Sequence, residues 1–540
     1  MANYTRLRTP FAGMSFTPDI PSNALAPNEY NNGLNVEADV RGIKKVGGEE
    51  SILSAVPGHQ IFIDGGFRSE SQWVFIVATR EGKWWLLTDS AITDITPGVG
   101  ANPSVTLSGY SDDTNITASW VGNVFFINDG LRSPMYFLPT ATEIYLYDQA
   151  PDNYVWNYDV GVSGTRAAFV RNFCSPNVGN ILIAGNLTKD FTSSGTTVNY
   201  PTTIRWSQAF ANTGVPATWM PTLSNVANEQ EIPVRGPIID GFFLGGNFYI
   251  CSYWDTVILS PIAYQNSSTP VFGVRLFNQG RGLINNNCWT NTDANVYGVD
   301  SRDIWIFNGS EFAPLGNQKV RDYFFRNLNP TYSDRLFMVN NTQKNQIEIY
   351  YPDLTSSTGW CNRMLSWRYD LQIWNAPKTI SNACNGCEAP VYLDGHFKYA
   401  SRTVTYGQGD TAGGSRLIQT NRGNSFSGLP IPAIFERTNL ALATPDGAVP
   451  YSSKVYIHRV LPEVSGTGSI NITVGGANST AQEPTYGQIG TTEISTDTPW
   501  VTTQQNNVRT ISVKIESNDA TDAWNVTALN WQAQIVEDAF

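Results

Sequence analysis

The feature that most constrains this chain is a dense succession of β-hairpin signals. Runs of β-branched and aromatic residues flank turn residues that tolerate positive φ, at 73–78 and 84–88, 118–121 and 124–127, 241–244 and 248–252, 337–340 and 346–351, and 391–393 and 397–400. Helical periodicity is scarce, and the best helix candidate spans about Asn317 to Leu328. The sequence therefore predicts an all-β protein with helix confined to a few short pieces.

The hairpins recur every few tens of residues between about Gly58 and Gly409. Several units share an aromatic strand, as at 83–87, 303–307 and 366–369. Four-stranded units repeated every ~40–50 residues are what a β-propeller requires. Six or seven blades fit the length, and a set of stacked β-sandwiches is the competing fold.

The amino-terminal part lacks such a pattern. Residues 1–57 hold four prolines between positions 10 and 27 and no self-sufficient apolar pattern. Such a segment cannot offset its own ordering entropy, so we expect an extended arm that packs on a neighbouring module or subunit. Residues 58–409 are then the β-propeller-like body.

The composition shifts again after the body. Residues 410–428 are rich in Gly, Ser, Asn and Arg and are predicted to be a linker or exposed loop. Alternating strands return at 455–457, 470–474, 511–515 and 529–535. Residues 429–540 are therefore predicted to be a C-terminal β-sandwich-like domain.

Charge and hydropathy narrow the functional classes. Only 15% of the 540 residues are charged, the net charge is −12, and no basic run occurs. A grip on nucleic acid needs clustered Lys and Arg, so this class is disfavoured. The low charge and many aromatic residues suit either surfaces hidden in partner contacts or simply a β-rich fold. The first residues contain no secretory signal and no stretch approaches ~18 apolar residues, so we expect a soluble protein made in a cytosol.

Histidine and cysteine offer little chemistry. His59, His396 and His458 stand in no metal-ligand or nucleophile motif, and structural roles are the better interpretation. Cys384 and Cys387 form one CxxC, whereas a zinc site needs four ligands. Cys361 and His396 are conceivable partners, but free thiols in a turn are favoured because a reducing compartment is expected.

Three other patterns are rejected or left open. Asn291, Asp293 and Asn295 begin like a calcium loop, but Arg302 stands where an EF-hand has its closing Glu. The string at 407–412 fits GxGxxA, yet no helix follows it to hold a pyrophosphate.

Paired carboxylates are the hardest class to exclude, because propeller glycosidases draw them from different blades. Asp240, Asp300, Asp303 and Glu311 are candidates, with exposed turn residues the favoured interpretation. No catalytic, cofactor-binding or metal-binding residue is assigned, and the chain is predicted not to be an enzyme.

Several strings resemble one family. The segment 21–48, PSNALAPNEYNNGLNVEADVRGIKKVGG, resembles the opening of tail nozzle proteins of short-tailed bacteriophages, also called tail tubular or tail-stabilisation proteins. Segment 203–233 looks like a mid-chain part of the same group, and the strands at 470–474 and 508–515, ending near Trp531, are also similar. The likeness lies in the general character of these segments and in their order along the chain, and none of the shared motifs is catalytic.

The resemblance implies a structural virion protein. It implies a β-propeller subunit of a ring, a homohexamer, that forms the distal tube below the portal and the tail adaptor protein. Needle, plug or fibre proteins would meet its distal or outer face, and the genome would pass through the lumen without specific binding. Synthesis in the host cytoplasm, residence in the virion tail and no membrane insertion follow. The alternative is a glycan-binding or glycan-cleaving β-propeller, as a receptor-binding protein or depolymerase.

Overall fold

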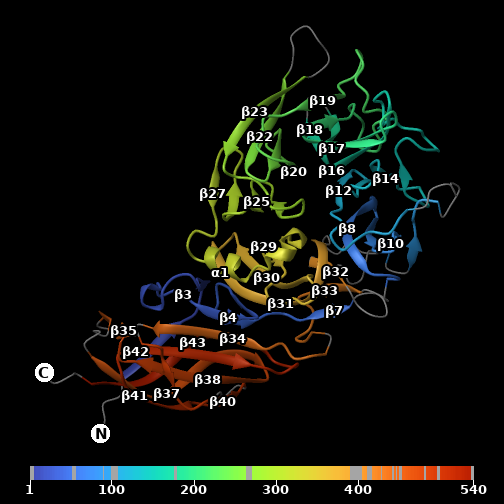
Figure 1. Ribbon diagram of the computed structural model, residues 1–540. Helices are drawn as coiled ribbons and strands as arrows, with labels where there is room; N and C mark the ends of the chain where they lie inside the picture. Colours follow the sequence, from blue (N-terminus) through green and yellow to red (C-terminus); the bar gives the residue numbers. More distant parts are fainter. Residues whose placement is uncertain are drawn as a thin grey trace.

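The structure is a computed structural model that describes residues 5–51, 56–88, 91–98, 107–175, 179–262, 271–388, 404–409, 416–426, 428–440, 443–444, 447–448, 453–479, 482–494 and 499–536. Within these ranges the only α-helix is α1 (Arg321–Asn327), accompanied by the 3₁₀ turns η1 (Ser22–Ala24) and η2 (Pro330–Arg335). Almost all other regular structure is β-strand, so the predicted all-β fold is confirmed. Figure 1 shows a large propeller body above a flat sandwich, with part of the amino-terminal segment, in blue, between them.

The first five blades are four-stranded antiparallel sheets whose strands follow chain order. The first blade contains β8 (Gln60–Ser69), β9 (Gln72–Thr79), β10 (Trp84–Leu87) and β11 (Ile92–Asp94), and the second contains β12 (Thr117–Val121), β13 (Val124–Asn128), β14 (Met135–Phe137) and β15 (Tyr145–Leu146). The third contains β16 (Val162–Ser175), β17 (Gly179–Phe191), β18 (Thr196–Trp206) and β19 (Asn228–Glu231), and the fourth contains β20 (Ile238–Leu244), β21 (Asn247–Ser252), β22 (Asp255–Ile262) and β23 (Val271–Gln279). The fifth contains β24 (Trp289–Asn291), β25 (Val296–Val299), β26 (Ile304–Phe307) and β27 (Phe312–Pro314). Blades therefore succeed one another along the chain, as a propeller requires.

The sixth and seventh blades share one long strand, β31 (Ile373–Glu388). Its first half closes a sheet with β28 (Phe337–Asn341), β29 (Gln346–Tyr351) and β30 (Cys361–Arg368), and its second half continues into β32 (Val404–Gln408), β33 (Leu417–Thr420) and β7 (Glu49–Ser51). The second half also lies beside β8 of the first blade. Counted in this way, the described residues form a closed ring of seven blades.

Two predicted boundaries are wrong. The propeller was expected to span 58–409, but its last blade is completed by β7 at 49–51 and by β33. Leu417–Thr420 was assigned to a linker, whereas all four residues are buried. The strand has only four residues and lies in a region rich in Gly, Ser and Arg, so the sequence does not reveal it. It pairs with β32 on one side and with β7 of the amino-terminal arm on the other.

Most predicted hairpins are confirmed. Four of the five correspond to β9–β10, β12–β13, β20–β21 and β28–β29. The fifth, at 391–400, lies outside the described residues. The helix expected near 317–328 is α1, whose first free N–H groups, those of Asp322 and Tyr323, each donate at 2.7 Å to the carboxylate of Asp19 in the arm.

The carboxy-terminal module is a sandwich of two sheets. One contains β41 (Val501–Val508), β37 (Lys454–Thr467), β43 (Ala523–Val536), β6 (Ile43–Lys45), β5 (Val36–Ala38) and β1 (Thr5–Pro10); the other contains β39 (Thr485–Tyr486), β38 (Ser469–Ala477), β40 (Gly490–Glu493), β42 (Thr510–Ser517), β34 (Ala433–Leu440) and β4 (Asn32–Leu34). Trp524 and Val526 of β43 are buried in alternation, and after a change of phase at Ala528 and Leu529 the alternation continues with Trp531. The period-two pattern in the sequence is therefore a packing pattern.

The arm is therefore shared by the two modules. Its strands β1, β4, β5 and β6 join the sandwich, and β7 joins the propeller. The short strands β2 (Ser15–Phe16) and β3 (Glu29–Tyr30) pair with each other between the modules, and β35 (Ala443–Thr444) pairs with β36 (Gly447–Ala448). One hydrophobic core runs from the sandwich through Phe11, Phe16 and Tyr30 of the arm into blades four to six.

Candidate functional site

The propeller centre is the natural place to look for a site, because propeller ligands commonly meet residues from several inner strands there. Arg171 of β16, Asp240 of β20 and Trp289 of β24 meet at this point. The guanidinium contacts both carboxylate oxygens, with Nε 3.0 Å from Oδ1 and NH2 2.6 Å from Oδ2. Trp289 Nε1 donates to the same Oδ2 at 2.7 Å, and Arg171 also lies 5.3 Å from the Trp289 ring. Asp240 is fully buried, and its carboxylate is held by Arg171 and Trp289, which lie on two other blades.

Backbone carbonyls complete this central network. Arg171 donates through NH1 to the oxygen of Ala118 at 2.8 Å and through NH2 to that of Asn286 at 3.0 Å. Asn286 Nδ2 in turn donates to the oxygen of Ala168 at 2.9 Å. These bonds link four consecutive blades around the axis. Each would leave a buried polar group unpaired if broken, so the network fixes the blades relative to one another.

A cavity of about 280 Å³ remains beside the network, lined by the inner strands and by Asp64. Burial raises the pKa of the Asp64 carboxyl to about 6, and Arg171 opposes that rise. A volume of this size holds a small molecule at most. The cavity beside the network is thus far too small for a nucleic-acid duplex.

The four carboxylates considered from the sequence do not converge. Asp240 is locked in the centre, while Asp300 and Asp303 lie together in the turn before β26. There Asp300 is paired with Arg281 at 2.9 Å and accepts backbone N–H groups, so it holds the turn. Glu311 is exposed in the turn between β26 and β27. A glycosidase pair needs two accessible carboxyl groups that face one sugar. Asp300 and Asp303 are neighbours, but both are buried and accept backbone N–H groups of their own turn, which is a structural role.

Histidine and cysteine have structural surroundings. His59 Nδ1 lies 2.8 Å from Glu81 Oε1 at the first blade, and His458 lies in β37 of the sandwich. His396 is outside the described residues. In the described part of the chain, no group of three His, Cys, Asp or Glu side chains could hold a metal ion.

The CxxC was expected in a turn, and that expectation is wrong. Cys384 and Cys387 both lie in β31, because Asn385 and Gly386 between them pair with β32. Residues three apart in a strand point to opposite faces, so the two thiols cannot share a ligand. Burial raises the pKa of Cys384 to about 12 and also raises that of Cys361. These are unreactive, buried thiols.

Two buried charge clusters were missed by sequence reasoning. In the third blade, Arg205 is fully buried, with NH2 2.5 Å from Glu229 and 2.8 Å from Asp159. Lys189 lies 3.0 Å from Asp159 and 2.8 Å from Glu229. Arg205 and Glu229 both fall in the segment 203–233, so that segment contributes a structural joint.

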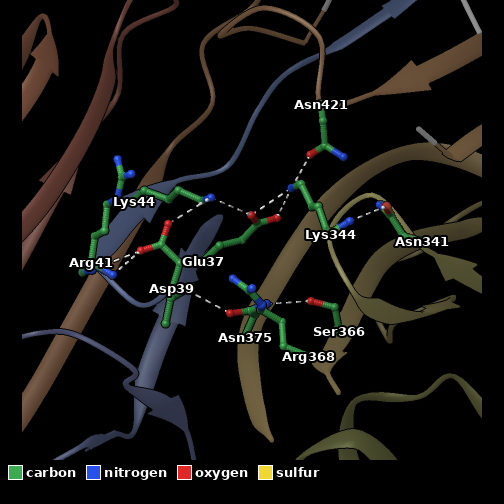
Figure 2. A network of polar contacts seen from close by, with 12 residues as sticks. Glu37, Asp39, Arg41, Lys44, Asn341, Lys344, Ser366, Arg368, Asn375 and Asn421 are labelled. Carbon is green, nitrogen blue, oxygen red and sulfur yellow. Dashed lines mark hydrogen bonds and ion pairs between the residues drawn. The ribbon is translucent and has the colours of Figure 1, made fainter. Parts of the chain in front are cut away.

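The second cluster joins the arm, the sixth blade and the end of β33 (Figure 2). Lys344 Nζ donates to both carboxylate oxygens of Glu37, at 2.6 and 2.8 Å, and to Asn421 Oδ1 at 2.6 Å. Lys44 stands on the other side, 4.0 Å from Glu37 and 3.4 Å from Asp39. Burial alone would raise the pKa of Glu37, but the two ammonium groups lower it to about 2. The junction therefore carries an ionised glutamate at neutral pH.

A backbone contact completes this junction. Asn375 Oδ1 accepts the N–H of Ala38 at 2.9 Å, and its Nδ2 donates to Ser366 at 3.1 Å. The Glu37–Lys344 and Ala38–Asn375 contacts join segments more than 300 residues apart in the sequence. A single sequence carries no signal for them beyond the presence of charged residues in an otherwise apolar strand.

Comparisons with known proteins add little. No protein-family description and no curated protein matches the chain. Among solved structures, the N-terminal domain BBS1N in complex with ARL6DN matches at 7% identity, over 71% of this chain and 98% of that one, with a TM-score of 0.39. The computationally designed Ika8 protein matches at 10% identity, over 68% and 99%, with a TM-score of 0.32. No helix among the described residues is long and apolar enough to cross a membrane.

Proposed function

We propose that this chain is a structural subunit of the tail nozzle of a short-tailed bacteriophage, assembled as a ring around the path of the genome. The observation that carries the proposal is the arm. The segment 21–48, which resembles the start of nozzle proteins, runs between propeller and sandwich and supplies strands β3 to β6. A tube subunit through which the genome is ejected should have modules that do not rotate freely against each other. The arm limits such rotation because its strands pair with both modules.

The central network adds a constraint on this proposal. Since Arg171, Asp240 and Trp289 close the axis of each propeller, the genome would have to pass between copies of the chain. The conduit is then a property of the ring. Tail adaptor, needle, plug and fibre proteins are the partners that the same proposal implies.

Glycan cleavage is the second candidate function, and the observation that bears on it is the state of Asp240. A glycosidase acid or nucleophile must reach the sugar, whereas both oxygens of this carboxylate are occupied by Arg171, Trp289 and the N–H of Gly241. The structural role is therefore preferred.

Immunogold labelling of intact virions tests the proposal. Antibodies against this chain should decorate the distal end of the tail tube, below the adaptor. Labelling confined to fibres or to the capsid would overturn the proposal. So would the absence of labelling on virions whose genome contains the gene.

A further inference from the structure

A groove opens between the fifth and sixth blades, away from the closed centre. Its volume is about 880 Å³. The turn between β24 and β25 forms one side, and the ends of β28 and β30 form the other. The lining residues that matter here are Asn291, Asp293, Tyr297, Asn340, Trp367 and Tyr369. The string that resembled the start of a calcium loop is thus one rim of the groove.

Three aromatic side chains give the groove its apolar surface. Trp367 and Tyr369 are half-buried, and Tyr297 is almost fully buried beneath them. The ring of Trp367 packs at 5.2 Å against Trp374 of the core, and Tyr369 donates its hydroxyl to Asn345 Oδ1 at 3.3 Å. These contacts hold both rings in place before any ligand arrives, which lowers the entropic cost of binding.

The polar part of the lining consists mainly of amides and hydroxyls. Asn340 Nδ2 donates to the backbone oxygen of Asn291 at 3.0 Å, whereas its Oδ1 is shielded from solvent and has no hydrogen-bond partner. The Asn340 amide therefore ties one rim of the groove to the other. The lining contains no Lys or Arg, and Asp293 lies at its rim.

We propose that this groove binds a neutral carbohydrate chain. Sugar rings present C–H faces that stack on fixed aromatic side chains, and their hydroxyls both donate to and accept from amides. A polyanion is disfavoured, since no cation lines the groove and Glu388, Asp370 and Asp293 all place negative charge around Tyr369. The inference does not depend on the nozzle proposal, because it concerns a site on the isolated chain.

Affinity electrophoresis of the full-length protein tests the groove directly. The gels contain dextran, pullulan, galactomannan or heparin, and an array of neutral bacterial oligosaccharides extends the panel. We expect retardation by at least one neutral glycan and none by heparin. Tyr369→Ala and Trp367→Ala should each weaken that binding by about tenfold or more, which corresponds to ~1.4 kcal/mol.

Two controls keep the outcome decisive. Trp254→Ala removes an aromatic ring that is 43% exposed and outside the groove, so it should leave binding unchanged. Tyr369 directly follows β30, whereas Trp367 lies within that strand. Thermal melting checks that both variants still fold. Retardation by heparin alone, by none of the neutral glycans, or equally in the Tyr369→Ala variant would overturn the proposal.

Discussion

The propeller and the sandwich depend on the amino-terminal arm to very different degrees. The propeller takes one three-residue strand from it, β7, at the outer edge of its last blade. The sandwich takes four strands, including β1 and β6, which together cover one edge of β43. An uncovered strand edge and an uncovered apolar face are both costly. In its strand ladders the propeller is thus nearly complete without the arm, whereas the sandwich is not.

The difference indicates how the chain is held together. Segments more than 400 residues apart form the sandwich, so the sandwich cannot form until both ends of the chain are present. The same arm then returns to the propeller, where Glu37 pairs with Lys344. The arm therefore makes the stability of one module depend on its attachment to the other.

Deleting residues 2–50 should have the largest effect. The deletion removes the strands that cover the edge of β43 and the buried side chains of Val36, Ala38 and Ile43. The resulting loss of unfolding free energy should exceed the ~5–15 kcal/mol stability of a typical domain. We expect the sandwich to be digested by protease while the propeller keeps a cooperative thermal transition, and ring assembly to fail. A shorter deletion of 2–11, which removes only β1, is the matched control with a smaller effect. Normal rings from the longer deletion would refute the prediction.

Arg205→Met should cost about 3–5 kcal/mol, because it leaves the carboxylates of Asp159 and Glu229 with reduced compensation. Urea unfolding measures the change. Arg166→Met is the control on the same blade, since that side chain is 31% exposed and pairs with Asp190 at 3.0 Å. An exposed pair is worth about 0–1 kcal/mol. Equal losses in the two variants would contradict the structural role of the third-blade cluster.

Lys344→Met should destabilise the junction by roughly 3 kcal/mol, because Glu37 stays buried without its closest cation. Lys44→Met should cost less, since that ammonium is half-exposed and 4.0 Å away. Differential scanning calorimetry gives both values. A larger loss in the Lys44 variant would show that the pairing at the junction is misassigned.

The stability of the junction should also depend on pH. The pKa of Glu37 is lowered to about 2 in the folded state, below its usual value near 4.5. Its contribution is therefore present above about pH 5 and lost as the pH falls toward 2. In Lys344→Met that loss should be smaller, because the pKa of Glu37 then moves back up. Unfolding measured from pH 7 to pH 3 tests this, and parallel curves for the two proteins would count against it.

We expect no appreciable binding of the protein to duplex DNA. The net charge is −12 and no basic run occurs in the sequence. A passive conduit gains nothing from phosphate contacts, since each would slow the genome. Fluorescence anisotropy at physiological salt should give no tight binding. Tight, salt-sensitive association would argue for a basic surface formed by the fold.

The sequence predicted elements better than their assembly. Hairpins such as β12–β13 were recognisable because their strands and turn residues are adjacent in the chain. The strand β33 was missed because four buried residues within a polar, Gly-rich region carry no periodicity, and its partner β7 lies more than 360 residues earlier. The Arg171–Asp240–Trp289 network was likewise invisible, since a single sequence does not reveal which inner strands face one another.

The most direct test of the account is electron cryomicroscopy of a virion that contains this chain. We expect density for seven-bladed propellers and their sandwiches arranged as a ring at the distal tail, with the genome path between subunits and the Arg171–Asp240–Trp289 network at the centre of each propeller. Density for the chain in a fibre or another part of the particle, or a genome path through the propeller itself, would contradict it.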